Sequence, residues 1–319
     1  MVREQYLSFI KTQLETAVKE ASPISDGAVA NYIPELANAD ASVVGAAIRL
    51  SDGTEIVAGD VKQEFTLQSV AKLIVLIGLM EEYGEDKIFS WINAEPTGFS
   101  FSSVAQVDRY GPIPSNPMVN AGAIALCSHI PGDNQSRSLW LDQWAERLFG
   151  QPLGVNGKVF ASERATGDRN RAIAYLLKSN KVLTLRVEDA LETYYYLCSY
   201  QVNTQIAAYL PTLLANGGVG PDGKRIISER TSNCVVSIMA TCGLYDESGM
   251  HLVRTGMPAK SGVSGLIVAV ATGRGGIAAY SPLLNSKGGS IRGHHILAKM
   301  SRELDWHFAA PWGYLRFDD

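Results

Sequence analysis

Ser69 and Lys72 are the first residues whose types and spacing could do chemistry. They lie three positions apart in FTLQSVAKLIVLIGLMEEYG (65–84), where an apolar stretch predicts a helix, and this spacing puts both side chains on one helix face. A serine hydroxyl becomes a nucleophile when a neighbouring group takes its proton, and a lysine whose pKa is lowered by burial can be that group. The motif alone is weak, because a serine that caps a helix is often followed by a lysine.

A second candidate is the Lys-Ser-Gly triplet 260–262 in MPAKSGVSG (257–265), which is expected to open a strand of small and apolar residues. A glycine there allows a ligand to approach the strand backbone, and exposed backbone N–H groups can polarise a carbonyl as an oxyanion hole. The alternative is an ordinary turn into a strand. A Ser-x-x-Lys helix followed by this triplet resembles the penicillin-recognising serine enzymes, so the two motifs together favour serine acyl transfer.

The elements that must position these motifs follow from the hydrophobic pattern. Residues 3–20 predict an amphipathic helix, and two hairpins are predicted at 43–60 and 262–282, where Ser51-Asp52-Gly53 and Thr272-Gly273-Arg274 form the turns. Helical periodicity marks 139–149, 169–180, 187–199, 203–215, 232–242 and 290–304. The sequence therefore predicts an α/β fold of α+β layers, in which a sheet is flanked by helices and carries an inserted all-helical subdomain. A cleft between the two parts is the expected place for a site.

Composition excludes several classes of protein. The chain has 319 residues, 46% of them hydrophobic, with a formal net charge of -4, so it can bury a large core and offers no basic surface for nucleic acid. The apolar run Leu73 to Met80 is too short to span a membrane, and the charged N-terminus does not look like a secretory signal. We expect neither nucleic acid nor a membrane as a partner.

The cysteines and histidines add no further chemistry. The four cysteines form no CxxC pair, which favours free thiols in a reducing compartment and hence a cytoplasmic location. The five histidines lack the spacing of metal ligands, and glycines 216–223 do not follow the pattern of a phosphate loop. We expect no metal and no cofactor.

Nine segments together resemble the glutaminase family with the β-lactamase/transpeptidase-like fold. They recur in the family's order between about residue 27 and residue 295: VANYIPELA (29–37), FTLQSVAK (65–72), EPTGFSFSS (95–103), NPMVNAGAIAL (116–126), ASERATGDRNRAIAYLL (161–177), YYYLCS (194–199), LANGG (214–218), CGLYDESG (242–249) and GMPAKSGVSG (256–265). The resemblance implies that residues 1–319 form one catalytic domain of the compact bacterial type. Its sheet-containing part would span approximately 1–68 and 250–319, and its helical subdomain approximately 69–249.

The resemblance also implies hydrolysis of the side-chain amide of L-glutamine to L-glutamate and ammonia by a homo-oligomer, either a dimer or a tetramer. Carried over by position, Ser69 is the nucleophile, Lys72 is its activating partner, Tyr245 is a proton relay, and Val263 supplies an oxyanion N–H beside that of Ser69. The positions that match substrate contacts are Tyr32, Ser69, Asn120, Glu163, Asn170, Tyr194, Tyr245 and Val263. A carboxylate suits the ammonium of glutamine, and amide and phenol groups suit its carboxylate and amide.

Each of these side chains has a plainer interpretation if it is taken singly. Asn120 and Asn170 could cap helices, Glu163 could be a solvated charge, and the tyrosines could be core or rim residues. A β-lactamase or transpeptidase is disfavoured because the chain has no Ser-Asp-Asn triplet, and a non-catalytic amino-acid sensor because Ser69 and Lys72 are both present. The departures from the family pattern are Gly289, Ser264 and the pair Ala271-Thr272.

Overall fold

A computed structural model describes residues 3–98, 102–104 and 111–310. Its elements are, in chain order, α1 (Arg3–Ala21), α2 (Pro34–Ala37), β1 (Gly45–Leu50), β2 (Glu55–Gly59), β3 (Phe65–Thr66), η1 (Gln68–Ala71), α3 (Lys72–Tyr83), α4 (Glu85–Phe89), α6 (Asn120–Cys127), α7 (Asn134–Phe149), β4 (Gly154–Val155), α8 (Gly157–Thr166), α9 (Asp168–Ser179), α10 (Val187–Cys198), β5 (Tyr200–Val202), α11 (Thr204–Ala207), α12 (Tyr209–Ala215), α13 (Glu229–Cys242), η2 (Tyr245–Glu247), α14 (Ser248–Thr255), β6 (Ala259–Ser261), β7 (Leu266–Ala271), β8 (Gly275–Tyr280) and α15 (Ile291–Glu303). None of the described helices is both long and apolar enough to cross a membrane.

The main sheet has five antiparallel strands in the order β2-β1-β8-β7-β6. Both ends of the chain meet at its centre, where β1 pairs with β8 so that Ile48 faces Ile277. Every residue of β7 and β8 is buried, because helices cover both faces of these strands, and this explains their continuous apolar sequence. The sheet thus fixes the ends of the chain around a buried centre.

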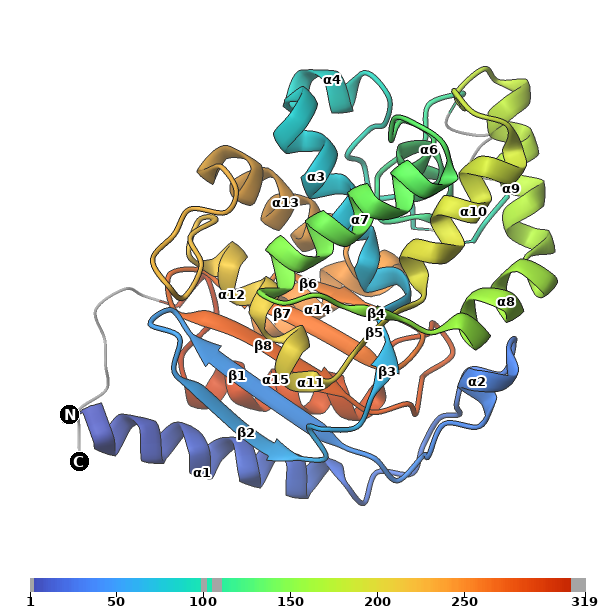
Figure 1. The fold of residues 1–319 in the computed structure, drawn as a ribbon. Coiled ribbons are helices and arrows are strands. Elements are labelled where there is room, and N and C mark those ends of the chain that lie inside the picture. Colours follow the sequence, from blue (N-terminus) through green and yellow to red (C-terminus); the bar gives the residue numbers. More distant parts are fainter. Residues whose placement is uncertain (1–2, 99–101, 105–110, 311–319) are drawn as a thin grey trace.

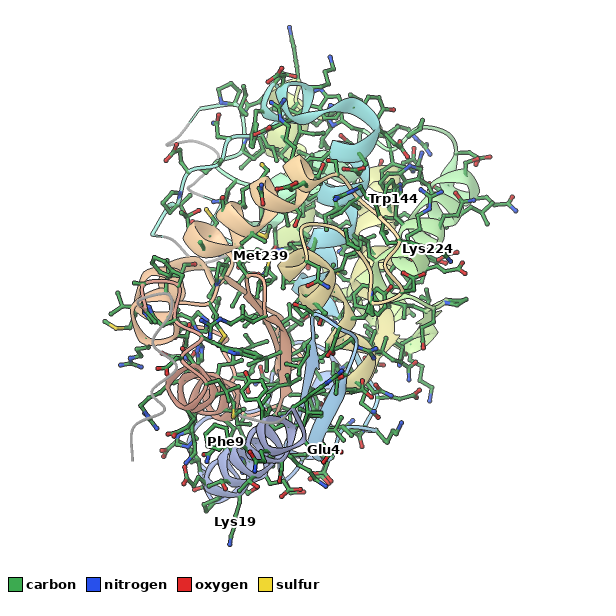
Figure 2. The ribbon with its side chains drawn as sticks, turned by 90° about the vertical axis from the view of Figure 1, so that its left-hand side faces the viewer. Glu4, Phe9, Lys19, Trp144, Lys224 and Met239 are labelled. Atoms are coloured by element: carbon green, nitrogen blue, oxygen red, sulfur yellow. The ribbon has the colours of Figure 1, made fainter. Side chains whose placement is uncertain are left out.

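Alternate residues of the sheet enter two separate cores. On one face, Ile267 and Ile277 pack with residues of α1 and α15. On the other face, Val268 and Ala278 pack with the apolar residues of α3, α6, α10 and α12. Figure 1 shows α1 and α15 below the sheet and the other large helices above it. In the turned view of Figure 2, α1 with Phe9 lies at the opposite end of the molecule from α7 with Trp144.

The structure confirms the predicted antiparallel sheet with flanking helices and a long helical insertion. The insertion also contains two short strands, β4 and β5, which form a second sheet in the order β3-β5-β4. Strands of two or three residues are too short to show an alternating pattern, so the sequence gives no sign of them.

Two local expectations differ from the structure. The Lys-Ser-Gly triplet closes a separate strand, β6, and does not open β7, because Gly265 adopts a φ of +106° in the turn that reverses the chain between them. Ser69 lies in the 3-10 turn η1 that precedes the α-helix, and α3 begins only at Lys72.

Candidate active site

A strained turn positions Ser69. Gln68 has a φ of +47°, a left-handed conformation that is rare for residues other than glycine and is held only where the surroundings impose it. Leu67 N–H donates to the Tyr200 carbonyl at 2.8 Å, which fixes the strand before the turn. The Gln68 side chain donates to Thr66 Oγ1 at 3.2 Å. The chain therefore leaves β3 sharply and places Ser69 on the wall of a cavity.

Lys72 lies at the base of this turn with its side chain completely buried. Its Nζ donates to the Met118 carbonyl at 2.9 Å and to Asn120 Oδ1 at 2.7 Å. Burial lowers the pKa of Lys72 to about 7, because the charged form loses its hydration. A neutral amine has two N–H groups and one lone pair. Both N–H groups are used in these hydrogen bonds, so the lone pair is left to accept a proton.

Tyr245 contacts Ser69, and Lys260 contacts Tyr245. The Tyr245 hydroxyl is hydrogen-bonded to Ser69, and Lys260 Nζ donates to it at 3.1 Å and to the Ser261 carbonyl at 2.7 Å. The Tyr245 ring centroid is 4.2 Å from Lys260 Nζ and 5.6 Å from Lys72 Nζ. Burial raises the pKa of Tyr245. The pKa of Lys260 lies well below its usual value, chiefly because of burial and also because of the neighbouring Lys72.

Lys260 is the residue that sequence analysis missed. The expectation for the triplet 260–262 rests on its glycine, which would let a ligand approach the strand backbone, and it includes no role for the lysine side chain. A lysine in a strand otherwise made of small residues is the signal that could have found it, since a fully buried lysine needs polar partners. The glycine also acts differently from the prediction: a Cβ at Gly262 would lie 2.7 Å from the Leu67 carbonyl oxygen. The close approach is therefore to the Ser69 turn.

A cavity of about 300 Å³ opens beside Ser69, at the small end of the range for ligand pockets. All but one of the predicted substrate contacts line it, namely Tyr32, Ser69, Asn120, Glu163, Asn170, Tyr194 and Val263. The exception, Tyr245, reaches Ser69 through the hydrogen bond described above. Within the described residues, the Val263 backbone N–H has no hydrogen-bond partner. Residues 99–101 of the segment 95–103 lie outside the part of the chain that is described.

Glu163 is a buried carboxylate with no ion-pair partner in the part of the chain that the structure describes. It lies on α8 and is 6% exposed. Tyr32 Oη donates to its Oε1 at 2.9 Å, and a second hydrogen bond comes from Gln68. Among residues 3–98, 102–104 and 111–310, no basic side chain forms an ion pair with Glu163, and burial raises its pKa. An unpaired buried carboxylate is costly, so this position favours a ligand that brings a positive charge.

The two asparagines connect the cavity to Lys72. Asn120 Nδ2 donates to Asn170 Oδ1 at 2.9 Å, while Asn120 Oδ1 accepts from Lys72. Asn120 is the first residue of α6, yet its side chain does not cap that helix. The helix start is held instead by Asn116 Oδ1, which accepts from the N–H groups of Met118 and Val119 at 3.0 and 3.2 Å. The Asn120 side chain is therefore not used as a helix cap, and it lines the cavity.

Comparison with known proteins places the chain in a family. The glutaminase family model matches residues 27–308. A glutaminase of Legionella pneumophila is 50% identical over 300 residues, which cover 93% of this chain and 97% of the relative. Glutaminase 2 of Clostridium perfringens is 41% identical over 286 residues, which cover 88% and 94%.

Solved structures agree with this match. The probable glutaminase YbaS superposes with a TM-score of 0.93 at 35% identity, covering 95% of this chain and 99% of its own. A probable glutaminase of Bacillus subtilis gives a TM-score of 0.86 at 33% identity, covering 93% and 96%. The chain belongs to the glutaminase family, and it is an enzyme that hydrolyses glutamine to glutamate.

Proposed function

We propose that this glutaminase works through a covalent glutamyl ester on Ser69. The observation that supports it best is the arrangement of Lys72, Tyr245 and Lys260 around one serine hydroxyl at the wall of the cavity. The serine can lose its proton to a neutral Lys72 on one side, and it is hydrogen-bonded to a phenol on the other. This is the environment that nucleophilic catalysis by serine requires.

The first half of the reaction forms the ester. Lys72 Nζ takes the Ser69 proton while Oγ bonds to the amide carbon of glutamine, and the backbone N–H groups of Ser69 and Val263 stabilise the oxyanion. The C–N bond then breaks, and ammonia leaves with a proton donated by Tyr245. Lys260 Nζ donates to the same phenol oxygen and stabilises it as its proton departs. The raised pKa of Tyr245 suits a proton donor better than a base.

The second half hydrolyses the ester. A water molecule gives one proton to the Tyr245 phenolate and attacks the ester carbon, while the same backbone N–H groups stabilise the oxyanion. The bond to Ser69 then breaks, and Ser69 Oγ takes back the proton held by Lys72. Glu163 pairs with the substrate ammonium throughout, while Asn120, Asn170, Tyr194 and Tyr32 hold the carboxylate and orient the side chain. None of these steps uses a cofactor.

The assay that tests this function compares three substrates. Purified protein should release ammonia from glutamine much faster than from asparagine, and it should not open a chromogenic β-lactam. Glutamine turnover should also give, on rapid acid quenching, protein whose intact mass is raised by one glutamyl group. β-Lactam turnover without glutamine turnover would favour the alternative serine acyl hydrolase. Glutamine binding without turnover would favour a non-catalytic relative.

Glu163→Gln should raise KM for glutamine at least about tenfold, since a charge pair with the ammonium is worth more than about 1.4 kcal/mol in a buried site. The reason is that Glu163 has no basic partner among the described residues. Initial rates over a range of glutamine concentrations measure the change. The matched control is Glu192→Gln, which removes the half-exposed partner of Arg164 and should leave KM unaltered. An unchanged KM in Glu163→Gln would show that this carboxylate does not bind substrate.

Activity should rise with pH through about 7, because Lys72 accepts a proton only when neutral and its pKa is about 7. Below pH of about 7 the Lys72 amine is protonated and cannot act as a base. There kcat/KM should fall about tenfold for each unit by which the pH is lowered. A profile of kcat/KM between pH 5 and 9 (roughly the range where such groups titrate) measures this. A flat profile across neutral pH would contradict Lys72 as the base.

The division of the domain, the number of subunits and the location of the enzyme are further proposals. We propose that sheet-containing residues 1–68 and 250–319 and helical residues 69–249 form the two parts of one domain, which the position of the main-sheet strands supports. We also propose a homo-oligomer in the cytoplasm. The four cysteines are free thiols, three of them buried, which suits a reducing compartment. Light scattering of the purified enzyme measures the number of subunits.

A further inference from the structure

The turn that carries Tyr245 is strained and must be held in place. Tyr245 has a φ of +57°, a conformation that costs free energy for a residue with a bulky side chain. Ser248 holds the backbone, since its Oγ accepts from Leu244 N–H at 2.9 Å and donates to the Tyr245 carbonyl at 3.0 Å. These contacts fix where the turn begins. At its other end the Glu247 N–H donates to the Leu244 carbonyl at 3.0 Å, so the Glu247 side chain is the part that remains to be held.

Asn285 ties Glu247 to a neighbouring loop. Its Nδ2 donates to Glu247 Oε1 at 2.8 Å. Its Oδ1 accepts from the N–H groups of Lys287 and Gly289 at 2.9 and 3.1 Å. One amide side chain therefore orders residues 285–289 and at the same time holds the last residue of η2.

The histidines behind Glu247 offer it no hydrogen bond. His251 Nε2 lies 3.2 Å from the Met257 carbonyl, which can only accept, so Nε2 carries the proton and Nδ1 is an acceptor. His294 Nδ1, 3.3 Å away, must then donate to it. His294 Nε2 therefore carries a lone pair and no proton. This atom has no hydrogen-bond partner among the described residues and lies 3.9 Å from Glu247 Oε2. Burial lowers the pKa values of His251 and His294 to about 3 and about 4, in keeping with neutral rings.

Gly289 closes the remaining space. A Cβ on this residue would lie 2.6 Å from Glu247 Oε2 and 2.7 Å from His294 Nε2. The carboxylate is thus confined between the backbone of Gly289 and an imidazole lone pair that repels it. The hydrogen bond from Asn285 is the strongest attraction on the Glu247 carboxylate, and the charges of Lys287 and Arg254 add to it from farther away. The departure from the family pattern at position 289 therefore makes room for Glu247 and His294.

We infer that Glu247 and Asn285 are positioning residues for Tyr245. Their hydrogen bond fixes the end of the strained turn and so keeps the Tyr245 hydroxyl in contact with Ser69 and Lys260. Neither residue lines the substrate cavity, so both act on the chemical step and not on glutamine binding. This inference rests on the proposed role of Tyr245 as proton donor.

Asn285→Asp tests the inference with little change of shape. The aspartate keeps the oxygen that accepts from Lys287 and Gly289, but it replaces the donor to Glu247 by a second carboxylate oxygen. We expect kcat to fall at least about tenfold, because a small misplacement of a catalytic group is costly, while KM stays within about twofold. Adding Glu247→Gln should restore kcat, since the glutamine amide can donate to Asp at position 285 and so reverses the original pair.

Three further measurements separate positioning from general damage. Lys224→Gln, the control, removes an exposed ion pair to Asp222 and should leave kcat unaltered. Glu247→Ala should reproduce the kcat loss without bringing two carboxylates together. It tests the same inference if Asn285→Asp does not fold. In a Tyr245→Phe background, Asn285→Asp should have no further effect on kcat.

Several outcomes would overturn the inference. They are an unchanged kcat in Asn285→Asp and Glu247→Ala, a loss that appears in KM, failure of the reversed pair to restore activity, and full additivity with Tyr245→Phe. The role of Tyr245 itself fails separately, if Tyr245→Phe alone keeps full activity.

Discussion

Ser69→Ala should abolish turnover and leave the fold intact. The hydroxyl is needed to form the ester, and the side chain lies on the cavity wall, where alanine fits without strain. Loss of a serine nucleophile lowers kcat by several orders of magnitude in other enzymes, on the order of a millionfold in one case. Ammonia release under substrate saturation measures the loss, and intact-mass analysis after acid quenching should no longer detect the glutamyl adduct.

A second serine in the adjoining turn provides the control for Ser69→Ala. Ser264 is buried, and its hydroxyl has no hydrogen-bond partner among the residues that the structure describes, so Ser264→Ala removes the same atom near the same site and should keep activity. Both variants should unfold at the wild-type temperature. Residual activity in Ser69→Ala above about one per cent of wild type would exclude a covalent serine mechanism.

Lys72→Ala and Tyr245→Phe should each lower kcat at least about a hundredfold, within the usual range for general acid–base catalysis. In the proposed mechanism both residues handle the proton that Ser69 releases and that ammonia requires. Lys72 Nζ lies 5.6 Å from the Tyr245 ring centroid. Because they act as one unit, the double variant should be little slower than the worse single variant.

The comparison of Lys72 and Tyr245 holds only for variants that unfold like the wild type. Lys72 donates to Met118 and Asn120, so its loss could let the cavity collapse. Lys72→Met keeps a long side chain without the amine and controls for this effect. It should be as inactive as Lys72→Ala. If the two losses multiply, the residues act independently. Full activity in Tyr245→Phe would make the phenol a wall of the site and leave Ser69 and Lys72 in place.

The sequence alone predicts those parts of the site that depend on local spacing. Ser69 and Lys72 are found because they lie three positions apart, and the central strands because β7 and β8 are apolar throughout. Tyr245 and Glu163 follow only from the resemblance to a family, since a tyrosine near Ser69 or an unpaired carboxylate leaves no local pattern. Their places depend on how distant segments pack.

Contacts between distant segments set the remaining features of the site. Lys260 matters because β6 brings it under the Tyr245 ring, and no spacing within 257–265 predicts that contact. The left-handed residue Gln68 likewise has no signal, because glutamine carries no preference for that conformation. The sequence leaves Asn120 open between a helix cap and a site residue. In the structure its side chain does not cap α6 and contacts Lys72 and Asn170, 48 and 50 positions away.

The two buried lysines make the folding of this enzyme a proton-releasing reaction. In the unfolded chain both amines are hydrated and bind protons up to pH of about 10, whereas in the folded chain burial lowers the pKa of Lys72 to about 7 and places that of Lys260 well below its usual value. Between those pH values the unfolded state binds more protons, so the free energy of unfolding rises with pH across this range. At and below neutral pH this linkage lowers the stability of the folded state, and the two hydrophobic cores must offset that cost. The two buried amines thus contribute to a higher free energy of unfolding in mildly alkaline solution than at neutral pH.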